Sequence, residues 1–214
     1  MKKVVLMGDS IRMGYDKYVK EALSGVAEVY YPSENCRFAE YMLRYAHVWK
    51  EDGKWPDDVD LVHWNAGLWD VLELFDDGPL TSISYYAEAI ARIDKRIRML
   101  YPNAKIVFAT STPVIEEKYG EGAKRHNDVI KAYNEAAIKA LAPGNTLIND
   151  LYTLADGLPE EYHSDCTHYS TDKGREAIGG RVISVICREL GIKSSQVNIE
   201  GFEPEKYSEE NIGF

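Results

Sequence analysis

The sequence Val4-Val5-Leu6-Met7-Gly8-Asp9-Ser10 opens the chain with a short apolar run that ends at a glycine. Such a run is typical of a buried strand that ends in a turn, and residues Ile11 to Leu23 can form a helix after it. Ser10 is therefore expected at a strand-to-helix corner, with its hydroxyl above the sheet and its backbone N–H at the positive end of the helix. This position suits a nucleophile and one donor of an oxyanion hole. Serine also caps helices, so the sequence leaves open whether Ser10 only caps this one.

Short apolar runs alternate with amphipathic segments along the chain, which predicts an α/β fold. We expect a single domain of three layers, in which a mostly parallel five-stranded sheet has helices on both faces. The expected strands are Val4–Met7, Val26–Tyr31, Val59–Trp64, Lys105–Ala109 and Thr146–Ile148, and the expected helices are Tyr15–Ser24, Arg37–Trp49, Ser84–Leu100, Asn127–Leu141 and Thr171–Leu190. Residues 1–193 would form the domain, and the polar residues 194–214 would form an extended tail that packs on the domain or on a partner.

The composition limits the class of protein. The chain has 214 residues, of which 45% are apolar, and this suits one globular domain rather than a disordered chain. The formal charge of −10 argues against a nucleic-acid partner and gives no attraction to an anionic membrane. The first apolar run is too short for a signal peptide, and no run approaches the ~18 residues of a membrane span. Three cysteines (Cys36, Cys166 and Cys187) cannot all pair, so we expect reduced thiols in a cytoplasmic protein.

The segment Asp165-Cys166-Thr167-His168 lies just before the last expected helix. An acid three residues before a histidine can bond one ring nitrogen, which leaves the other nitrogen free to face a serine. A serine hydroxyl needs such a base, and the base needs an orienting carboxylate. We therefore expect Ser10 as nucleophile, His168 as base and Asp165 as its partner, with Ser10 Oγ about 2.6–3.2 Å from a His168 nitrogen.

Other interpretations of this segment stay open. Asp165 and His168 could form only a loop hydrogen bond. His163, Asp165 and His168 could instead ligate a metal, because the three supply two imidazoles and a carboxylate. Cys166 could act as a thiol nucleophile. A G-x-S-x-G motif, which would mark the usual nucleophile elbow of α/β-hydrolases, is absent from the sequence.

The chain resembles the SGNH (GDSL-type) hydrolases over roughly residues 3–190. Gly8-Asp9-Ser10 matches the first block of that family, and Asp165-Cys166-Thr167-His168 matches its last Asp-x-x-His block. The resemblance implies a flavodoxin-like fold, an esterase or acyl hydrolase activity and no cofactor. It also implies that Ser10 is the nucleophile, that His168 is the general base and then the acid, and that Asp165 orients His168.

The two middle blocks of the family are altered in this chain. Cys36 stands where a glycine would supply a backbone N–H, a role that does not depend on the side chain. Trp69 stands where an asparagine would supply its amide, and Asn65, at the end of a strand, is our candidate in its place. The expected oxyanion hole is therefore made of the Ser10 and Cys36 N–H groups and the Asn65 side chain. Expected substrate contacts come from Asp9, Arg37 and Trp69.

The sequence as a whole predicts a serine esterase. Its expected substrate is a small-molecule ester, with an acyl group such as acetyl on a carbohydrate or another polar alcohol. Acyl transfer to an alcohol is a related alternative, and a catalytically weak ligand-binding protein on the same fold is another. Assembly into a homo-oligomer is left open.

Overall fold

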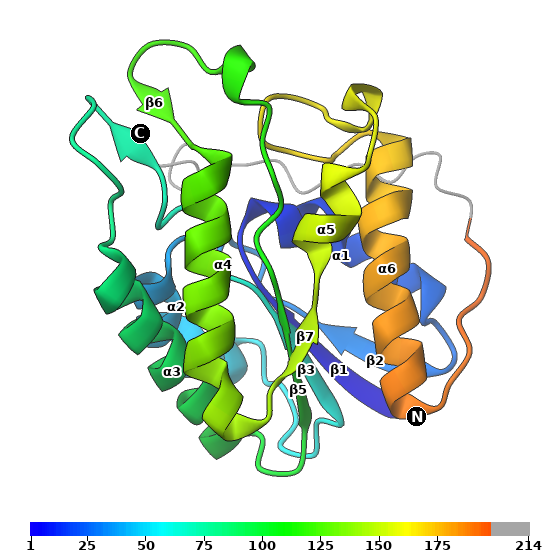
Figure 1. Cartoon of the computed structure of the whole chain (residues 1–214). Helices are drawn as coiled ribbons and strands as arrows, with labels where there is room; N and C mark the ends of the chain where they lie inside the picture. Colours follow the sequence, from blue (N-terminus) through cyan, green and yellow to red (C-terminus); the bar gives the residue numbers. More distant parts are fainter. Residues whose placement is uncertain (198–214) are drawn as a thin grey trace.

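The computed structural model describes residues 1–197 and has a parallel five-stranded sheet at its centre (Figure 1). The strand order is β2-β1-β3-β5-β7, and every neighbouring pair is parallel. Counted along this sheet, the order is 2-1-3-4-5, which is the flavodoxin-like arrangement. The strands are β1 (Lys2–Met7), β2 (Ala27–Tyr30), β3 (Leu61–Trp64), β5 (Lys105–Ala109) and β7 (Leu147–Asn149). The predicted α/β fold and all five predicted strands are confirmed, with shifts of up to two residues at their ends.

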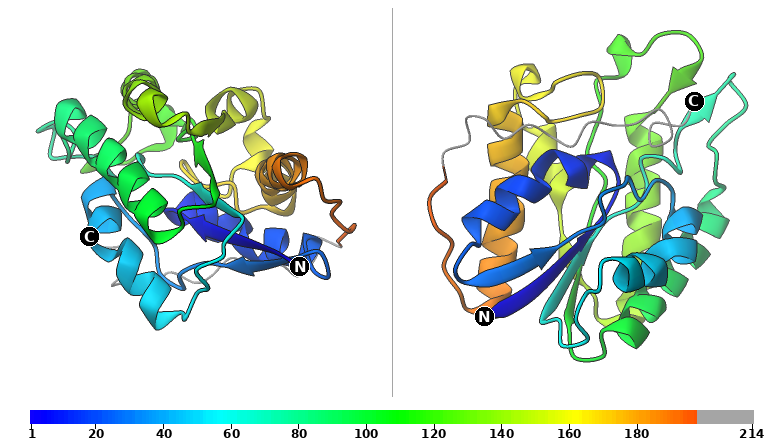
Figure 2. Two further views of the ribbon diagram at one scale, coloured as in Figure 1. Left: turned by 90° about the horizontal axis from the view of Figure 1, so that it is seen from below. Right: turned by 180° about the vertical axis from the view of Figure 1, so that it is seen from behind.

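Helices cover both faces of this sheet, which completes the three predicted layers (Figures 1 and 2). On one face α1 packs against α6, and the short α5 also contacts α6; on the other, α3 packs between α2 and α4. A Cβ at Gly179 of α6 would lie 2.8 Å from the Tyr18 ring, so this glycine permits the close approach of α6 to α1. The helices are α1 (Ser10–Ala22), α2 (Ala39–Asp52), α3 (Ile83–Leu100), α4 (Asn127–Leu141), α5 (Leu151–Asp156) and α6 (Asp172–Leu190).

The core lies where the two central strands are covered on both sides. The last four residues of β1 and all four of β3 are buried. Parallel strands buried on both faces carry continuous apolar runs instead of alternation, which explains why β1 and β3 stood out in the sequence. Met7 and Trp64 pair in register at the ends of these strands, so the residues that follow them, Gly8 and Asn65, meet at the carboxyl edge of the sheet.

The structure differs from the prediction at α1 and at the shortest elements. Helix α1 begins at Ser10 and not at Tyr15, because Asp9 caps it by accepting a 3.0 Å hydrogen bond from the Ile11 N–H. The two-residue strands β4 (Glu73–Leu74) and β6 (Ala123–Lys124) pair antiparallel and were not predicted. Strand β6 projects beyond the carboxyl edge of the sheet (Figure 1). Strands this short carry no periodicity that a sequence pattern could reveal.

The expected tail falls only partly within the described residues. Residues 194–197 have no regular secondary structure, and the Ser195 N–H donates a 2.8 Å hydrogen bond to the Ala22 carbonyl at the end of α1. The rest of the expected tail, residues 198–214, lies outside the described residues. Within residues 1–197, no helix combines the length and the apolar character that a membrane crossing requires.

One buried histidine predicts how stability depends on pH. Burial lowers the pKa of His63 from 6.5 to about 3, and Asn149 donates to its Nε2 at 3.1 Å. Below about pH 6.5, His63 is protonated in the unfolded chain but stays neutral in the folded protein. The free energy of unfolding therefore falls as the pH falls. We expect wild type to lose about 2 kcal/mol more unfolding free energy than His63→Gln between pH 7 and pH 5 in urea titrations. Burial raises the pKa of Asp70 to about 7, which acts in the opposite sense but equally in both proteins. If wild type and His63→Gln lose the same unfolding free energy over this range, the lowered pKa of His63 is wrong.

Candidate active site

The β1–α1 corner places Ser10 at the carboxyl edge of the sheet. Asp9 is the N-cap of α1, so the interpretation of Ser10 as a mere helix cap is wrong. Gly8 is required at this corner, because a Cβ there would lie 1.9 Å from Asn65 Oδ1. Ser10 is the first residue of the helix, so its backbone N–H belongs to the electropositive first turn.

Ser10, His168 and Asp165 form a continuous hydrogen-bonded chain. His168 Nε2 lies 2.8 Å from Ser10 Oγ, and His168 Nδ1 lies 2.7 Å from Asp165 Oδ2. Both hydrogen bonds expected from the sequence are therefore present, across a separation of 158 residues for the first. With Nδ1–H donating to the carboxylate, Nε2 is left as the acceptor for the serine proton, which is the arrangement that activates a hydroxyl.

The local structure keeps Asp165 ionised. Burial opposes its charge, but the His168 side chain and the backbone N–H groups of Thr167 and His168 all donate to it, and together they hold its pKa well below the usual range. The two backbone donors lie 2.7 and 2.8 Å from Oδ1. The turn that brings Asp165 to the ring of His168 is thus fixed by the same carboxylate, and this is why acid and base can stand three residues apart.

Ser10 and His168 open into a pocket of about 300 Å³. The loop before β6 and Ala123 of β6 line this pocket together with the Asp165–His168 loop. Trp69 also lines the pocket, where its placement is compatible with the expected substrate contact. The residues that line the pocket are Ser10, Asn35, Trp69, Leu72, Tyr119, Gly120, Glu121, Ala123, Arg125, Asp165, Cys166, Thr167 and His168.

The expected Cys36 donor needs correction. Its backbone N–H already donates to the Gly8 carbonyl at 3.1 Å, and its side chain is fully buried, with Sγ accepting from the Gly8 N–H at 3.3 Å. Cys36 therefore fastens its loop to the β1–α1 corner and does not offer a donor to the pocket.

Asn65 and Asp9 also have other roles than expected. Asn65 Nδ2 donates to Asp9 Oδ1 at 2.9 Å, and neither residue is among those that line the pocket. Asp9 is fully buried, so the expectation that it contacts substrate is wrong. The two side chains form a support beneath Ser10: Asn65 holds Asp9, and Asp9 caps the helix that begins at Ser10.

Asn35 lies on the pocket wall with Ser10 and His168, a position that sequence reasoning did not assign to it. Its Oδ1 accepts from the Arg37 N–H at 2.8 Å, so its Nδ2 is the remaining polar atom of the amide. Arg37 has a left-handed backbone (φ 50°), and its guanidinium lies 4.9 Å from the Tyr41 ring centre. Arg37 does not line the pocket, so the substrate contact expected of it is not supported.

Arg12 holds the loop that carries Asn35. This fully buried arginine donates to the carbonyls of Pro32 (2.9 Å) and Glu34 (2.5 Å), and it pairs with Asp16. Because Arg12 lies in the first turn of α1, it couples the position of Asn35 to the helix that begins at Ser10. In the sequence, Arg12 is visible only as a basic residue in the helix after Gly-Asp-Ser. This position alone does not predict which groups Arg12 contacts.

The thiol and metal interpretations of residues 163–168 are not supported by the geometry. Both ring nitrogens of His168 face Ser10 and Asp165, and the His163 ring packs on Tyr169 at 4.0 Å between ring centres. Cys166 Sγ lies 3.7 Å from Thr167 Oγ1. Among residues 1–197, no group of three histidine, cysteine or acidic side chains is placed to hold a metal ion.

Comparisons with known proteins agree with this fold. No protein-family model and no curated protein sequence matches the chain. Among solved structures, a lipase/acylhydrolase from Enterococcus faecalis matches with a TM-score of 0.68 and 21% identity, covering 92% of this chain and 100% of that one. A GDSL-like lipase from Bacteroides thetaiotaomicron matches at 0.67 and 17% (87% and 88% covered), and an acetyl xylan esterase at 0.64 and 20% (86% and 99% covered). The chain therefore has the fold of GDSL-type lipases and acylhydrolases.

Proposed function

We propose that this protein is a serine-dependent carboxylic ester hydrolase that removes a small acyl group, such as acetyl, from a carbohydrate or another polar alcohol. The observation that carries the proposal is the chain Asp165–His168–Ser10, with hydrogen bonds of 2.7 and 2.8 Å, that opens into a pocket. A loop pair or a helix cap would not need all three side chains in line at the edge of a cavity.

The proposed reaction proceeds through an acyl-enzyme. Ser10 Oγ attacks the ester carbonyl carbon while His168 Nε2 takes the hydroxyl proton. The C–O bond to the alcohol then breaks, and His168 gives the proton to the leaving oxygen. Water repeats the sequence on the acyl-enzyme, which releases the acid and restores Ser10. Asp165 stays ionised throughout and stabilises the imidazolium that forms in each half-reaction.

The oxyanion hole in this proposal uses the Ser10 N–H and Asn35 Nδ2. The Asn35 amide shares the pocket with Ser10, and the hydrogen bond from Arg37 to its oxygen directs the nitrogen away from that contact. Because Arg12 fixes this loop, the donor is in place before charge develops on the ester oxygen. Preorganised donors of this kind supply much of the stabilisation of a tetrahedral intermediate.

The size and walls of the pocket support a small polar substrate. A volume of about 300 Å³ lies at the lower end for small-molecule sites. Trp69 and Tyr119 give it aromatic walls on which a sugar ring can stack. One of the similar structures is an acetyl xylan esterase, which agrees with an acetylated carbohydrate as the substrate class.

A serine-directed fluorophosphonate probe tests the proposed nucleophile. We expect rapid covalent labelling, which peptide mass spectrometry maps to Ser10, because His168 activates this hydroxyl. His168→Ala should abolish the labelling, whereas Cys166→Ala, at a neighbouring residue of the same loop, should leave it intact. Labelling that survives in Ser10→Ala would overturn the assignment.

The proposed substrate class needs a separate measurement. Acetylated xylose and 4-nitrophenyl acetate should both release free acetic acid, quantified enzymatically, with wild type but not with Ser10→Ala. If the acetyl group is found on an added acceptor alcohol and no free acetate is released, the protein is an acyltransferase and not a hydrolase.

A further inference from the structure

Arg125 lies on the wall of the pocket directly after β6. Only 9% of the Arg125 surface is exposed to solvent, and Arg125 lines the same cavity as Ser10 and His168. Arg125 Nε donates to the Leu68 carbonyl at 2.6 Å, and Nη1 donates to the Tyr119 hydroxyl at 3.3 Å. These two contacts hold the guanidinium in one orientation and leave Nη2 with no hydrogen-bond partner among residues 1–197.

The charge of Arg125 is not neutralised by a neighbouring carboxylate. No ion pair to it is formed within the described part of the chain, and both of its hydrogen-bond partners are neutral. Buried charges are normally paired, since an unpaired one loses its hydration without compensation. Asp9 is near enough to interact electrostatically with Arg125, but within residues 1–197 no hydrogen bond or ion pair joins the two side chains, and Asp9 Oδ1 accepts from Asn65 and Ile11.

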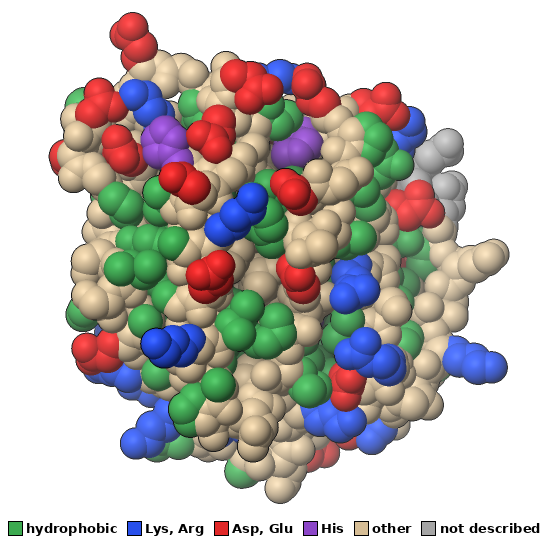
Figure 3. Space-filling model, in the orientation of Figure 1, with side chains coloured by type: hydrophobic (Ala, Val, Ile, Leu, Met, Phe, Trp, Pro, Cys, Tyr) green, Lys and Arg blue, Asp and Glu red, His purple; other side chains and the backbone are tan. Residues whose placement is uncertain are grey.

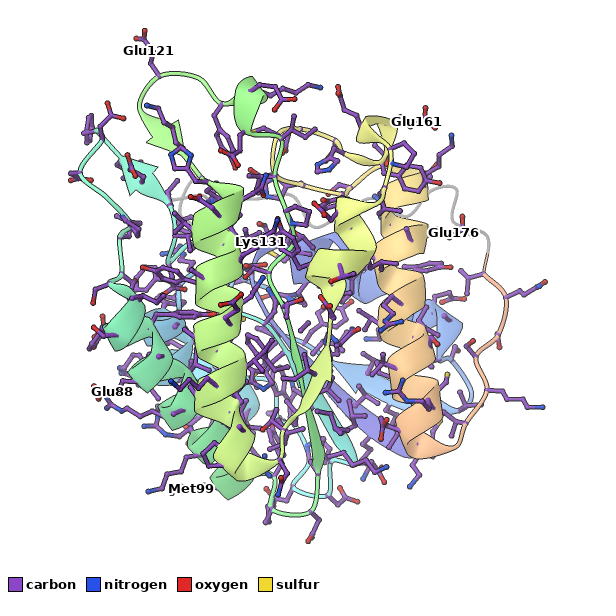
Figure 4. The ribbon with its side chains drawn as sticks, viewed as in Figure 1. Glu88, Met99, Glu121, Lys131, Glu161 and Glu176 are labelled. Atoms are coloured by element: carbon purple, nitrogen blue, oxygen red, sulfur yellow. The ribbon has the colours of Figure 1, made fainter. Side chains whose placement is uncertain are left out.

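The other charged groups around the pocket do not supply this partner. Asp165 is committed to His168, and Glu121 lies at the exposed tip of the loop before β6 (Figure 4). Acidic side chains gather along this upper edge of the molecule (Figure 3), but several are paired with lysines, as Glu160 is with Lys118. Arg125 is the one arginine or lysine among the described residues that line the pocket.

We propose that Arg125 makes the pocket select esters that carry a carboxylate, which pairs with the guanidinium while Ser10 attacks the ester. The inference rests on the proposed function. A planar guanidinium presents its donors in a fixed fork that suits a carboxylate, and a pair of this kind gains strength in a site shielded from water. The carboxylate lies on either the acyl group or the alcohol of the substrate.

Arg125 also has a structural connection to the proposed catalytic loop. Tyr119 Oη, which accepts from Arg125, lies 2.6 Å from Thr167 Oγ1, one residue before His168. A purely structural Arg125 would therefore affect all esters alike through this connection. Tyr119→Phe breaks the connection and keeps the charge, so it is the matched control.

The test uses two pairs of esters that differ in one carboxylate. The alcohol pair is 4-acetoxybenzoate against methyl 4-acetoxybenzoate, and the acyl pair is mono-4-nitrophenyl glutarate against 4-nitrophenyl pentanoate, each corrected for the rate with Ser10→Ala. We expect wild type to favour the carboxylate in one pair by about 10- to 100-fold in kcat/KM, as for a hydrogen bond to a charged group. The pair that responds identifies the side of the ester that carries the carboxylate.

Three variants separate charge recognition from structure. Arg125→Gln should bring the preference close to one, mainly through a higher KM for the carboxylate ester. Tyr119→Phe should leave the preference unchanged, and Glu121→Gln should raise it about twofold at low salt by removing a like charge. If wild type hydrolyses the neutral esters without preferring either carboxylate, or if Arg125→Gln slows both members of a pair equally, the inference is wrong while the hydrolase assignment stands. Hydrolysis of no ester above Ser10→Ala would instead refute the hydrolase assignment.

Discussion

Ser10→Ala is expected to lower kcat/KM for 4-nitrophenyl acetate by about 10⁴- to 10⁶-fold. The reason is that His168 then has no hydroxyl to activate, and the remaining groups can only bind the ester and stabilise its oxyanion. Initial rates measured with purified wild type and variant give the ratio directly. The fold should survive, because the substitution removes one oxygen at the pocket surface and keeps a good helix former in the first turn of α1.

Two controls make the Ser10 result specific. Ser84→Ala, at an exposed position near the start of α3, should leave the rate unchanged. Cys166→Ser should retain most of the activity, because His168 Nε2 faces Ser10 and not the thiol. Thermal unfolding of each variant excludes loss of structure as the cause. A Ser10→Ala protein that is folded and as active as wild type would end the hydrolase proposal.

The hydrogen-bonded chain of Ser10, His168 and Asp165 could be predicted from the sequence because its geometry is mostly local. Asp165 and His168 are three residues apart, so one turn brings them together. Ser10 follows a strand that is recognisable by its apolar run, and parallel strands end at a common edge. The contact across 158 residues then follows from the fold class, without knowledge of any other side chain.

The donors of the proposed oxyanion hole could not be predicted in the same way. Whether an N–H is available depends on the path of the loop that carries it, and in this loop the Cys36 N–H donates to the Gly8 carbonyl. The role of Asn65 depends on Asp9, which captures its amide. Arg125 directly follows β6, which pairs with β4, and strands of two residues have no sequence signature. Its place on the pocket wall could therefore not be predicted. Sequence patterns reveal elements, whereas these roles are set by single hydrogen bonds between them.

Asn35→Ala is expected to lower kcat by about 10²- to 10³-fold with little change in KM. An oxyanion donor acts on charge that develops only in the transition state, so its loss appears in kcat and not in ground-state binding. The hydrogen bond from the Arg37 N–H to Asn35 Oδ1 leaves the Nδ2 hydrogens for the ester oxygen. Asn35→Asp has nearly the same shape but has no donor, and it adds negative charge where the oxyanion forms. It should therefore be at least as slow as Asn35→Ala.

Variants of Cys36 and Asn65 distinguish Asn35 as the oxyanion donor from these two residues, which the sequence predicted as donors. Cys36→Ala keeps the backbone hydrogen bond to Gly8, so its kcat should fall by less than about tenfold. Asn65→Ala removes one of the two hydrogen bonds to Asp9 Oδ1 and should lower the melting temperature, because this oxygen of the buried carboxyl group then accepts from the Ile11 N–H alone. If Asn65 is the donor, the pattern is reversed. Asn35→Ala would then keep kcat within about threefold of wild type, and Asn65→Ala would lower kcat without lowering the melting temperature. Steady-state kinetics and thermal unfolding of these variants distinguish the two, since a support beneath Ser10 acts on stability while a donor acts on kcat.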